Sequence, residues 1–189
     1  SMESFTAVGE VIRFGLGAVA KVGHNAIEAI VDARKEGKFT SLWDFISRVD
    51  LHAVSKSAIE NLIKAGAFDE ITPNRAQLAA ALPDFVQVAQ KKNRDEGQYS
   101  LFELLDDAPE DAAGPEMPEI SEYGVFERLE HEKEVMGIYI SGHPFDSYEE
   151  KVRKHATCTI EDLSCWKGSF SAKVGGIILS VTNKITKNG

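Results

Sequence analysis

The sequence has no long apolar stretch and hardly any cysteine, and each shortage excludes a class of protein. No run approaches the roughly 18 apolar residues of a membrane-spanning helix, and no signal-peptide pattern opens the chain. Cys158 and Cys165 are the only cysteines, and the six residues between them fit neither a zinc knuckle nor a redox pair. We therefore expect two free thiols in a reducing, cytoplasmic compartment, and no membrane partner.

The sequence also lacks a recognisable catalytic or metal-ligating set. His131, His143 and His155 recur at twelve-residue intervals, but no carboxylate or thiol has the spacing that a metal site needs. Ser141 lies near His143 without any sign of the strained turn that presents a nucleophilic serine. We expect no metal, no cofactor and no catalytic activity in this chain by itself.

What the chain does have is an uneven charge. The 189 residues are 43% apolar and 27% charged, which is typical of a soluble globular protein, and the formal net charge is −9. Residues 1–92 are neutral overall, residues 93–135 carry −11 and residues 136–189 carry +2. Long-range attraction to DNA would be weak, so any DNA contact has to be local and made to the backbone.

We expect a mainly α-helical protein in four parts. They are a tandem helix-hairpin-helix region (1–92), a flexible acidic linker (93–121), a helical connector (122–157) and the first strands of a further domain (158–189). Between Asp106 and Ser121 the linker holds three prolines and six acidic residues, too few apolar groups to fold alone. The end of the chain reads as a domain cut off midway, so we expect a fragment of a longer protein.

The apolar periodicity predicts the individual helices. In the first part they cover 11–20, 25–34, 40–46 (with Thr40 or Ser41 as N-cap), 55–65 and 75–92. A further helix is expected near 126–137 and another from Asp146, whereas 170–185 alternates like a pair of strands.

The turn between the first two helices is a candidate phosphate site. It comprises Lys21, Val22, Gly23, His24 and Asn25. Gly and Asn tolerate positive φ, which would point successive backbone N–H groups outward at the start of the next helix. Those groups and the helix dipole bind phosphate without reading bases. A plain helical hairpin that packs its valine and isoleucine inward is the alternative.

A second, weaker copy of this turn comprises Ser55, Lys56 and Ser57. Ser55 is suited to cap the following helix, and Lys56 to contact phosphate. Because this copy has no glycine, it is alternatively the structural mate of the first hairpin.

Five residues inside the acidic linker form a third candidate site: Gln98, Tyr99, Ser100, Leu101 and Phe102. Two large apolar side chains in a charged segment are normally avoided unless something covers them. A polar anchor beside adjacent apolar anchors is typical of a docking peptide. The motif resembles the sliding-clamp-binding pentapeptide of bacterial DNA polymerases and repair factors. Alternatively, Ser100 to Leu105 forms a short helix that folds back onto the protein's own core.

Several runs, in order, resemble the alpha subunit of bacterial DNA polymerase III. They are Ile12–Val19 with the hairpin after it, Asn61–Asp69, Arg128–Pro144 with its Gly142-His143-Pro144 break, and Val174–Gly189. The resemblance implies that the last run begins an OB-fold and that the polymerase's catalytic carboxylates lie in a palm domain outside this chain. It also implies duplex DNA held through its backbone, the sliding clamp docked on Gln98–Phe102, and other replisome subunits as partners of the parent chain.

Two departures and two alternatives accompany this resemblance. Asn25 stands where the usual hairpin has a second glycine, and the second hairpin is poor in glycine. A helix-hairpin-helix module of a DNA repair nuclease would bind branched or nicked DNA and ignore the clamp. A protein-interaction scaffold would bind no DNA at all.

Overall fold

The chain folds into two compact units. The computed structural model describes residues 4–9, 11–95, 114–169, 171–178 and 180–183. One unit spans Ser1–Tyr139 and the other Ile140–Gly189. The pentapeptide Gln98–Phe102 lies outside the described residues. Among the helices that are described, none has the length and apolarity to cross a membrane.

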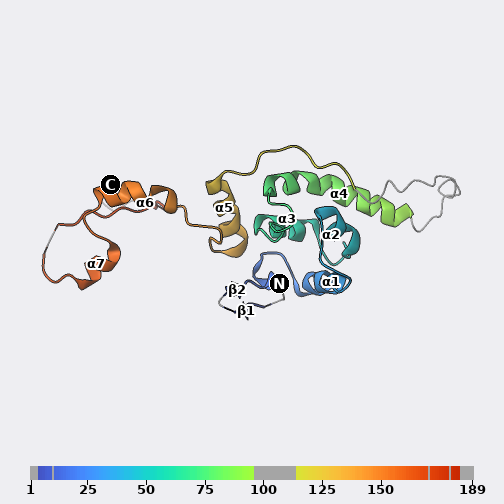
Figure 1. Ribbon diagram of the computed structural model, residues 1–189, viewed down its shortest axis with the longest axis horizontal. Coiled ribbons are helices and arrows are strands. Elements are labelled where there is room, and N and C mark those ends of the chain that lie inside the picture. The colour runs from blue at the N-terminus through green and yellow to red at the C-terminus, as the bar shows by residue number, and fades with distance from the viewer. Residues whose placement is uncertain (1–3, 10, 96–113, 170, 179, 184–189) are drawn as a thin grey trace. The chain divides into compact units, whose positions relative to one another are not determined.

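The first unit is mainly helical, with one small hairpin at its start (Figure 1). Strands β1 (Thr6–Val8) and β2 (Val11–Arg13) pair antiparallel, with Ala7 opposite Ile12. A single 3-10 turn, η1 (Leu16–Ala18), follows. The helices are then α1 (His24–Arg34), α2 (Leu42–Arg48), α3 (Lys56–Lys64), α4 (Arg75–Asp95) and α5 (Val125–Met136).

The structure confirms most of the expected helices and corrects the first. Ser41 caps α2 by accepting a hydrogen bond from the Asp44 N–H, and Gly66 follows α3 with a φ of +79°. The helix expected over 11–20 is wrong, because this stretch contains β2 and η1. Val11 and Ile12 are β-branched and favour a strand, and Gly15 and Gly17 lower the helix propensity of the rest.

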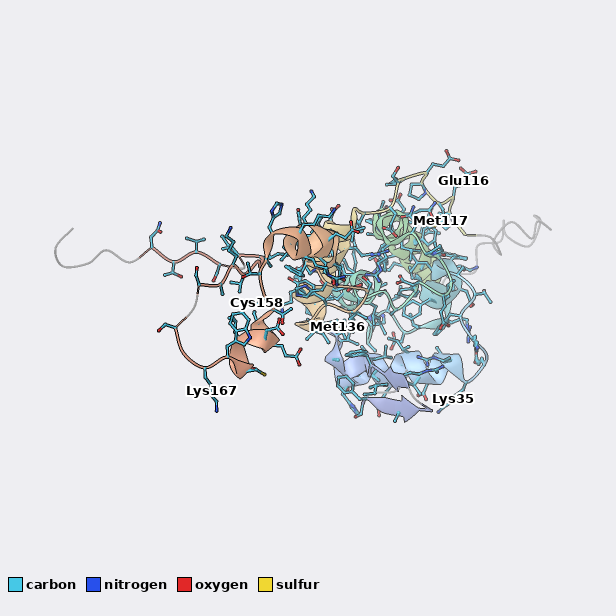
Figure 2. The ribbon with its side chains drawn as sticks, turned by 60° about the vertical axis from the view of Figure 1, so that its left-hand side comes forward. Lys35, Glu116, Met117, Met136, Cys158 and Lys167 are labelled. Atoms are coloured by element: carbon cyan, nitrogen blue, oxygen red, sulfur yellow. The ribbon has the colours of Figure 1, made fainter. Side chains whose placement is uncertain are left out.

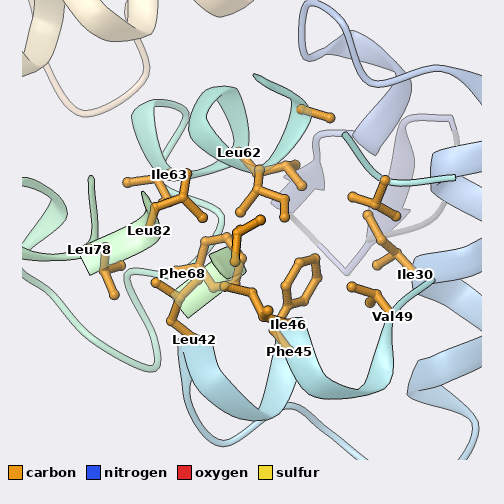
Figure 3. Packing of buried hydrophobic residues seen from close by; sticks show 14 of the residues in the cluster. Ile30, Leu42, Phe45, Ile46, Val49, Leu62, Ile63, Phe68, Leu78 and Leu82 are labelled. Carbon is orange, nitrogen blue, oxygen red and sulfur yellow. The ribbon is translucent and has the colours of Figure 1, made fainter. Parts of the chain in front are cut away.

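The core of the first unit is one apolar cluster to which η1 and all five helices, α1 to α5, contribute (Figure 3). Phe45 stacks edge-on against both Phe39 and Phe68, and Trp43 does so against Phe85. The large side chains with almost no exposed surface come mainly from α2, α3 and α4, with Val54 just before α3 and two residues of α5: Leu42, Ile46, Val54, Ile59, Leu62, Ile63, Leu78, Leu82, Leu129 and Glu132. This packing joins the two expected hairpins into one body.

Residues 114–124, here called the return segment, lie along the helices of the first unit (Figures 1 and 2). Met117 packs against the core, and the side-chain amides of Gln77 and Asn74 donate to the carbonyls of Pro118 and Ile120 at 2.9 and 2.6 Å. At Gly114, φ is +68°, and a Cβ there would collide with the Trp43 ring. This part of the expected flexible linker therefore packs on the first unit. The side-chain amides of Asn74 and Gln77 hydrogen-bond to its main-chain carbonyls.

Helix α5 belongs to the first unit through a buried ion-pair network. The Arg75 guanidinium donates to both carboxylate oxygens of Asp69, at 2.9 and 2.7 Å, and to Glu132 at 2.9 Å. Arg75 is 4% exposed and Glu132 is completely buried. Burial alone would lower the pKa of Arg75, but the hydrogen bonds and charges of Asp69 and Glu132 raise it. The buried Glu132 carboxylate thus ties α5 to the start of α4.

The second unit contains η3 (Asp146–Tyr148), α6 (Glu149–His155) and α7 (Ile160–Cys165). Thr159 and Asp162 form a reciprocal capping box at α7, a helix the sequence pattern did not predict. Over 171–178 and 180–183 the structure assigns neither helix nor strand, so the expected strand pair is not formed there. Strands need a ladder of partners, whereas the described Lys173 pairs with a loop residue: its carbonyl accepts the Thr157 N–H, and its N–H donates to Thr157 Oγ1.

Candidate nucleic-acid interface

Two helix starts in the first unit repeat the same pattern 32 residues apart. The valine before each helix is buried, and so are the alanine and isoleucine of its first turn: Val22, Ala26 and Ile27 in one copy, and Val54, Ala58 and Ile59 in the other. The three residues between valine and alanine are exposed in both copies, Gly23-His24-Asn25 and Ser55-Lys56-Ser57. Apolar residues thus anchor each turn, and three consecutive residues face solvent.

The backbone of the first turn differs from the expectation at Gly23 and Asn25. Gly23 is the N-cap of α1 with an extended φ of −79°, and Asn25 lies within the helix. The positive φ falls on Lys21, at +64°. Val22 is buried just before α1 begins, and the backbone is extended at Gly23. The change in chain direction therefore falls on Lys21, the residue before Val22. The Val22 N–H donates to the Val19 carbonyl at 3.2 Å and so does not point at a phosphate. Val22 therefore contributes to the core through its side chain.

The N-terminus of α1 has no side-chain cap. The N-cap Gly23 and the neighbouring Asn25 are exposed, and a Cβ added at Gly23 would meet nothing within 4 Å. The first N–H groups of a helix have no partner inside the helix and carry its positive dipole end. This geometry suits an anion that approaches from solvent, with the exposed Lys21 beside it.

The Glu134 carboxylate of α5 interacts with two lysines, Lys64 and Lys21. Glu134 pairs with Lys64 at 2.9 Å, and its side chain is 61% exposed. The hydrogen bond from Lys64 and its charge, and more weakly His131 and then Lys21, lower the pKa of Glu134. The lysines are therefore partly neutralised by a residue of the protein itself.

The start of α3 carries its own cap, as expected for Ser55. Its hydroxyl accepts the Ala58 N–H at 3.2 Å. Before it, Asp50 accepts the His52 N–H at 2.8 Å and closes the turn that leads to the fully buried Val54. Lys56 and Ser57 remain exposed, so this turn offers a point charge and a hydroxyl more than free backbone groups.

The start of α4 is occupied by a carboxylate of the return segment. Glu122 accepts the N–H groups of Arg75, Ala76 and Tyr123 at 2.7, 3.2 and 2.7 Å. Desolvation opposes its charged form, but these three donors and the charge of Arg128 outweigh it and lower the pKa of Glu122. Asn74 accepts the Gln77 N–H at 2.9 Å. Sequence reasoning missed this contact, since Glu122 is 47 residues from Arg75 and no local pattern marks it.

Neither a metal centre nor a disulfide is found in the part of the chain that the structure describes. No group of three or more His, Cys, Asp or Glu side chains gathers among these residues. Cys158 and Cys165 are both free thiols (Figure 2 labels Cys158).

The chain is similar to a known structural motif and to a set of known proteins. Residues 1–78 match the family model of the helix-hairpin-helix motif. Over 94% of its length the chain is 38% identical to DNA polymerase III subunit alpha of Vibrio cholerae. The proteins of the same name from Thermus aquaticus and Saccharopolyspora erythraea are 38% and 34% identical, over 98% and 100% of this chain.

The match covers a small part of each relative. The chain spans 16%, 15% and 17% of the lengths of these three proteins. The resemblance stated from the sequence is thereby confirmed: along nearly all of its length this chain is similar to one segment of the DNA polymerase III alpha subunit, and its first 78 residues match the helix-hairpin-helix motif.

Proposed function

We propose that this chain is a non-catalytic segment of a bacterial replicative DNA polymerase, in which it holds duplex DNA and docks onto the sliding clamp. One observation carries the DNA-binding half of the proposal. Two helix starts with exposed Gly23-His24-Asn25 and Ser55-Lys56-Ser57 rest on a shared core. The relatives, named as DNA polymerase III alpha subunits, supply the replicative setting.

The expected DNA contacts are to phosphates. Helix N-termini and lysines recognise phosphate charge without distinguishing bases. Residues 1–92 carry no net charge, so the attraction acts at short range and falls quickly with salt. Lys21 and Lys56 supply the charges, and the first turns of α1 and α3 supply backbone donors.

The clamp-docking half rests on the pentapeptide. Gln98 would fill a polar subsite of the clamp, with Leu101 and Phe102 in its apolar pocket; Tyr99 and Ser100 join these anchors. Tethering to a ring around DNA makes rebinding intramolecular, which raises processivity without tight DNA affinity. In this proposal the catalytic carboxylates lie in a palm domain elsewhere in the parent polymerase, residues 158–189 begin an OB-fold, and the parent chain works in the bacterial cytoplasm with other replisome subunits.

Salt-dependent DNA binding tests the first half. The chain should bind a labelled duplex at low salt with an affinity that falls as salt rises. Lys21→Gln and Lys56→Gln should each make the dependence of log K on log salt shallower by about one phosphate equivalent. Lys92→Gln, at the far end of α4, is the matched control. No binding at low salt would favour a scaffold, and a marked preference for branched or nicked DNA would favour a repair module.

Binding to purified sliding clamp tests the second half. Replacing Gln98, Leu101 and Phe102 together by alanine should abolish clamp binding while the helical content stays unchanged. Leu104→Ala with Leu105→Ala removes apolar side chains just beyond the motif and should leave clamp binding intact. Unchanged clamp binding in the triple variant would refute docking through this peptide.

A further inference from the structure

Both backbone hydrogen-bonding groups of Ala20 are held by distant elements of the first unit. Its N–H donates to the Val135 carbonyl of α5 at 2.8 Å. Its carbonyl accepts a hydrogen bond from the Asn61 side-chain nitrogen of α3 at 2.6 Å. Asn61 is 41 residues from Ala20 and Val135 is 115, so the first turn is fixed from outside its own hairpin.

Asn61 occupies a position where an apolar residue would be ordinary. It is 7% exposed on the α3 face that also buries Ala58, Ile59, Leu62 and Ile63. A buried amide is costly unless it is hydrogen-bonded, so its presence on this face needs a specific reason. The Ala20 carbonyl supplies a partner for the amide.

Fixing the Ala20 carbonyl fixes the peptide that leads into Lys21. Lys21 has a φ of +64°, in the left-handed region that side-chain-bearing residues rarely adopt. Such a conformation persists only where its surroundings enforce it. Val22 then enters the core and Gly23 begins α1, so the direction of the first N–H groups of α1 follows from this peptide.

We infer that Asn61 is a positioning residue for phosphate binding: from the second hairpin, it holds the Ala20–Lys21 peptide so that Lys21 and the start of α1 face the same anion. This inference rests on the proposed DNA-binding function. It also means that the two hairpins are mechanically linked, since α3, which begins at Ser55-Lys56-Ser57, sets the geometry of the first turn.

The test compares Asn61→Ala with Asn74→Ala in the full chain. Asn74 makes a closely similar bond, from its side-chain nitrogen to the Ile120 carbonyl at 2.6 Å, in the return segment. Asn61→Ala should weaken duplex binding about tenfold at low salt and make the salt dependence shallower by about one phosphate equivalent. Asn74→Ala should leave that slope unchanged. Partial unfolding lowers apparent affinity without changing the slope, so the slope separates positioning from lost stability.

Asn61→Leu covers the case in which Asn61→Ala folds poorly. It keeps the volume on the apolar face of α3 and lacks the donor, so it should show the same shallower slope. Combined with Lys21→Gln, it should change the slope less than the sum of the single variants, because both act on the same phosphate. Independent of DNA, the Ala20 amide should exchange with solvent faster in Asn61→Leu than in Asn74→Ala.

The outcomes separate the inference from the proposed function. Wild-type slope and wild-type Ala20 exchange in both Asn61 variants would overturn the positioning role while DNA binding stands. Absence of any salt-dependent binding by the unsubstituted chain would overturn the proposed function and the phosphate role of Asn61 together. A shallower slope with faster Ala20 exchange supports the inference.

Discussion

The starts of α1 and α4 differ in what meets the unpaired backbone N–H groups and the positive dipole end of a helix. At α4 the Glu122 carboxylate accepts the N–H groups of Arg75 and Ala76, so an anion of the protein fills the positive end of the helix. At α1 no side chain caps the helix and its N-cap Gly23 is exposed. A helix start that stabilises the fold is filled from within, and one suited to an external anion is left open. The start of α3, capped by Ser55 beside an exposed Lys56, lies between the two.

The largest expected effect follows from breaking the ion-pair network of the Arg75 side chain, in the first turn of α4. Arg75→Ala removes an ion-pair partner of the fully buried Glu132 and should lower the free energy of unfolding by about 3 to 5 kcal/mol. Urea denaturation measures this. Lys35→Ala removes the exposed pair with Asp32 and should give no measurable change. A small loss in Arg75→Ala would mean that the network does not hold α5 in place.

Glu122→Gln tests whether charge matters at the closed helix start. The folded-state pKa of Glu122 lies below its ordinary value of 4.5, so its contribution is complete well above 4.5 and disappears as pH falls through the folded-state pKa. Glu122→Gln should cost about 1 to 2 kcal/mol at neutral pH and much less in strong acid. Unfolding measured across the acid range compares it with Glu119→Gln, which should follow the wild type. If the free energy of unfolding of wild type and Glu122→Gln changed with pH in parallel, the charge of Glu122 would not stabilise the start of α4.

Ser55→Ala tests the intermediate case. Loss of the hydroxyl that accepts the Ala58 N–H should destabilise the first unit by about 1 kcal/mol. Ser57→Ala, two residues further into the same helix and exposed, should be neutral or slightly stabilising, because alanine is the better helix former. Thermal unfolding of the two variants side by side gives the difference. Equal stability would show that the cap contributes nothing.

Glu134→Gln should give the smallest effect, on the open side of the comparison. It removes the negative charge that pairs with Lys64 and attracts Lys21. DNA affinity at low salt should rise about threefold, and the gain should vanish at high salt. Glu130→Gln, exposed on the same helix, is the control in the anisotropy titration. Unchanged or weaker binding at low salt would place the lysines near Glu134 away from the DNA.

Local patterns predicted the helices well and the backbone of the first turn less well. The stripe that contains Ala26, Ile27 and Ile30 predicted α1, and Ser55 was recognised as the cap of α3. The pattern predicts a positive φ at Gly23 and Asn25, the residue types that adopt it at least cost, whereas Lys21 adopts it. Intrinsic preference is a weak guide where a buried neighbour such as Val22 fixes the path of the chain.

The sequence by itself determined helices α1 to α5 of the first unit and the uneven charge along the chain. It also determined the two exposed triplets, Gly23-His24-Asn25 at the start of α1 and Ser55-Lys56-Ser57 at the start of α3. These depend on residues within one or two turns of each other, where periodicity and capping rules apply. The tertiary structure decided which helix starts are open. Asn61 reaches Ala20, Glu122 reaches the start of α4, and Arg75 reaches Glu132 across 41 to 57 residues. Such contacts depend on how the chain reverses and packs, and no local spacing encodes that.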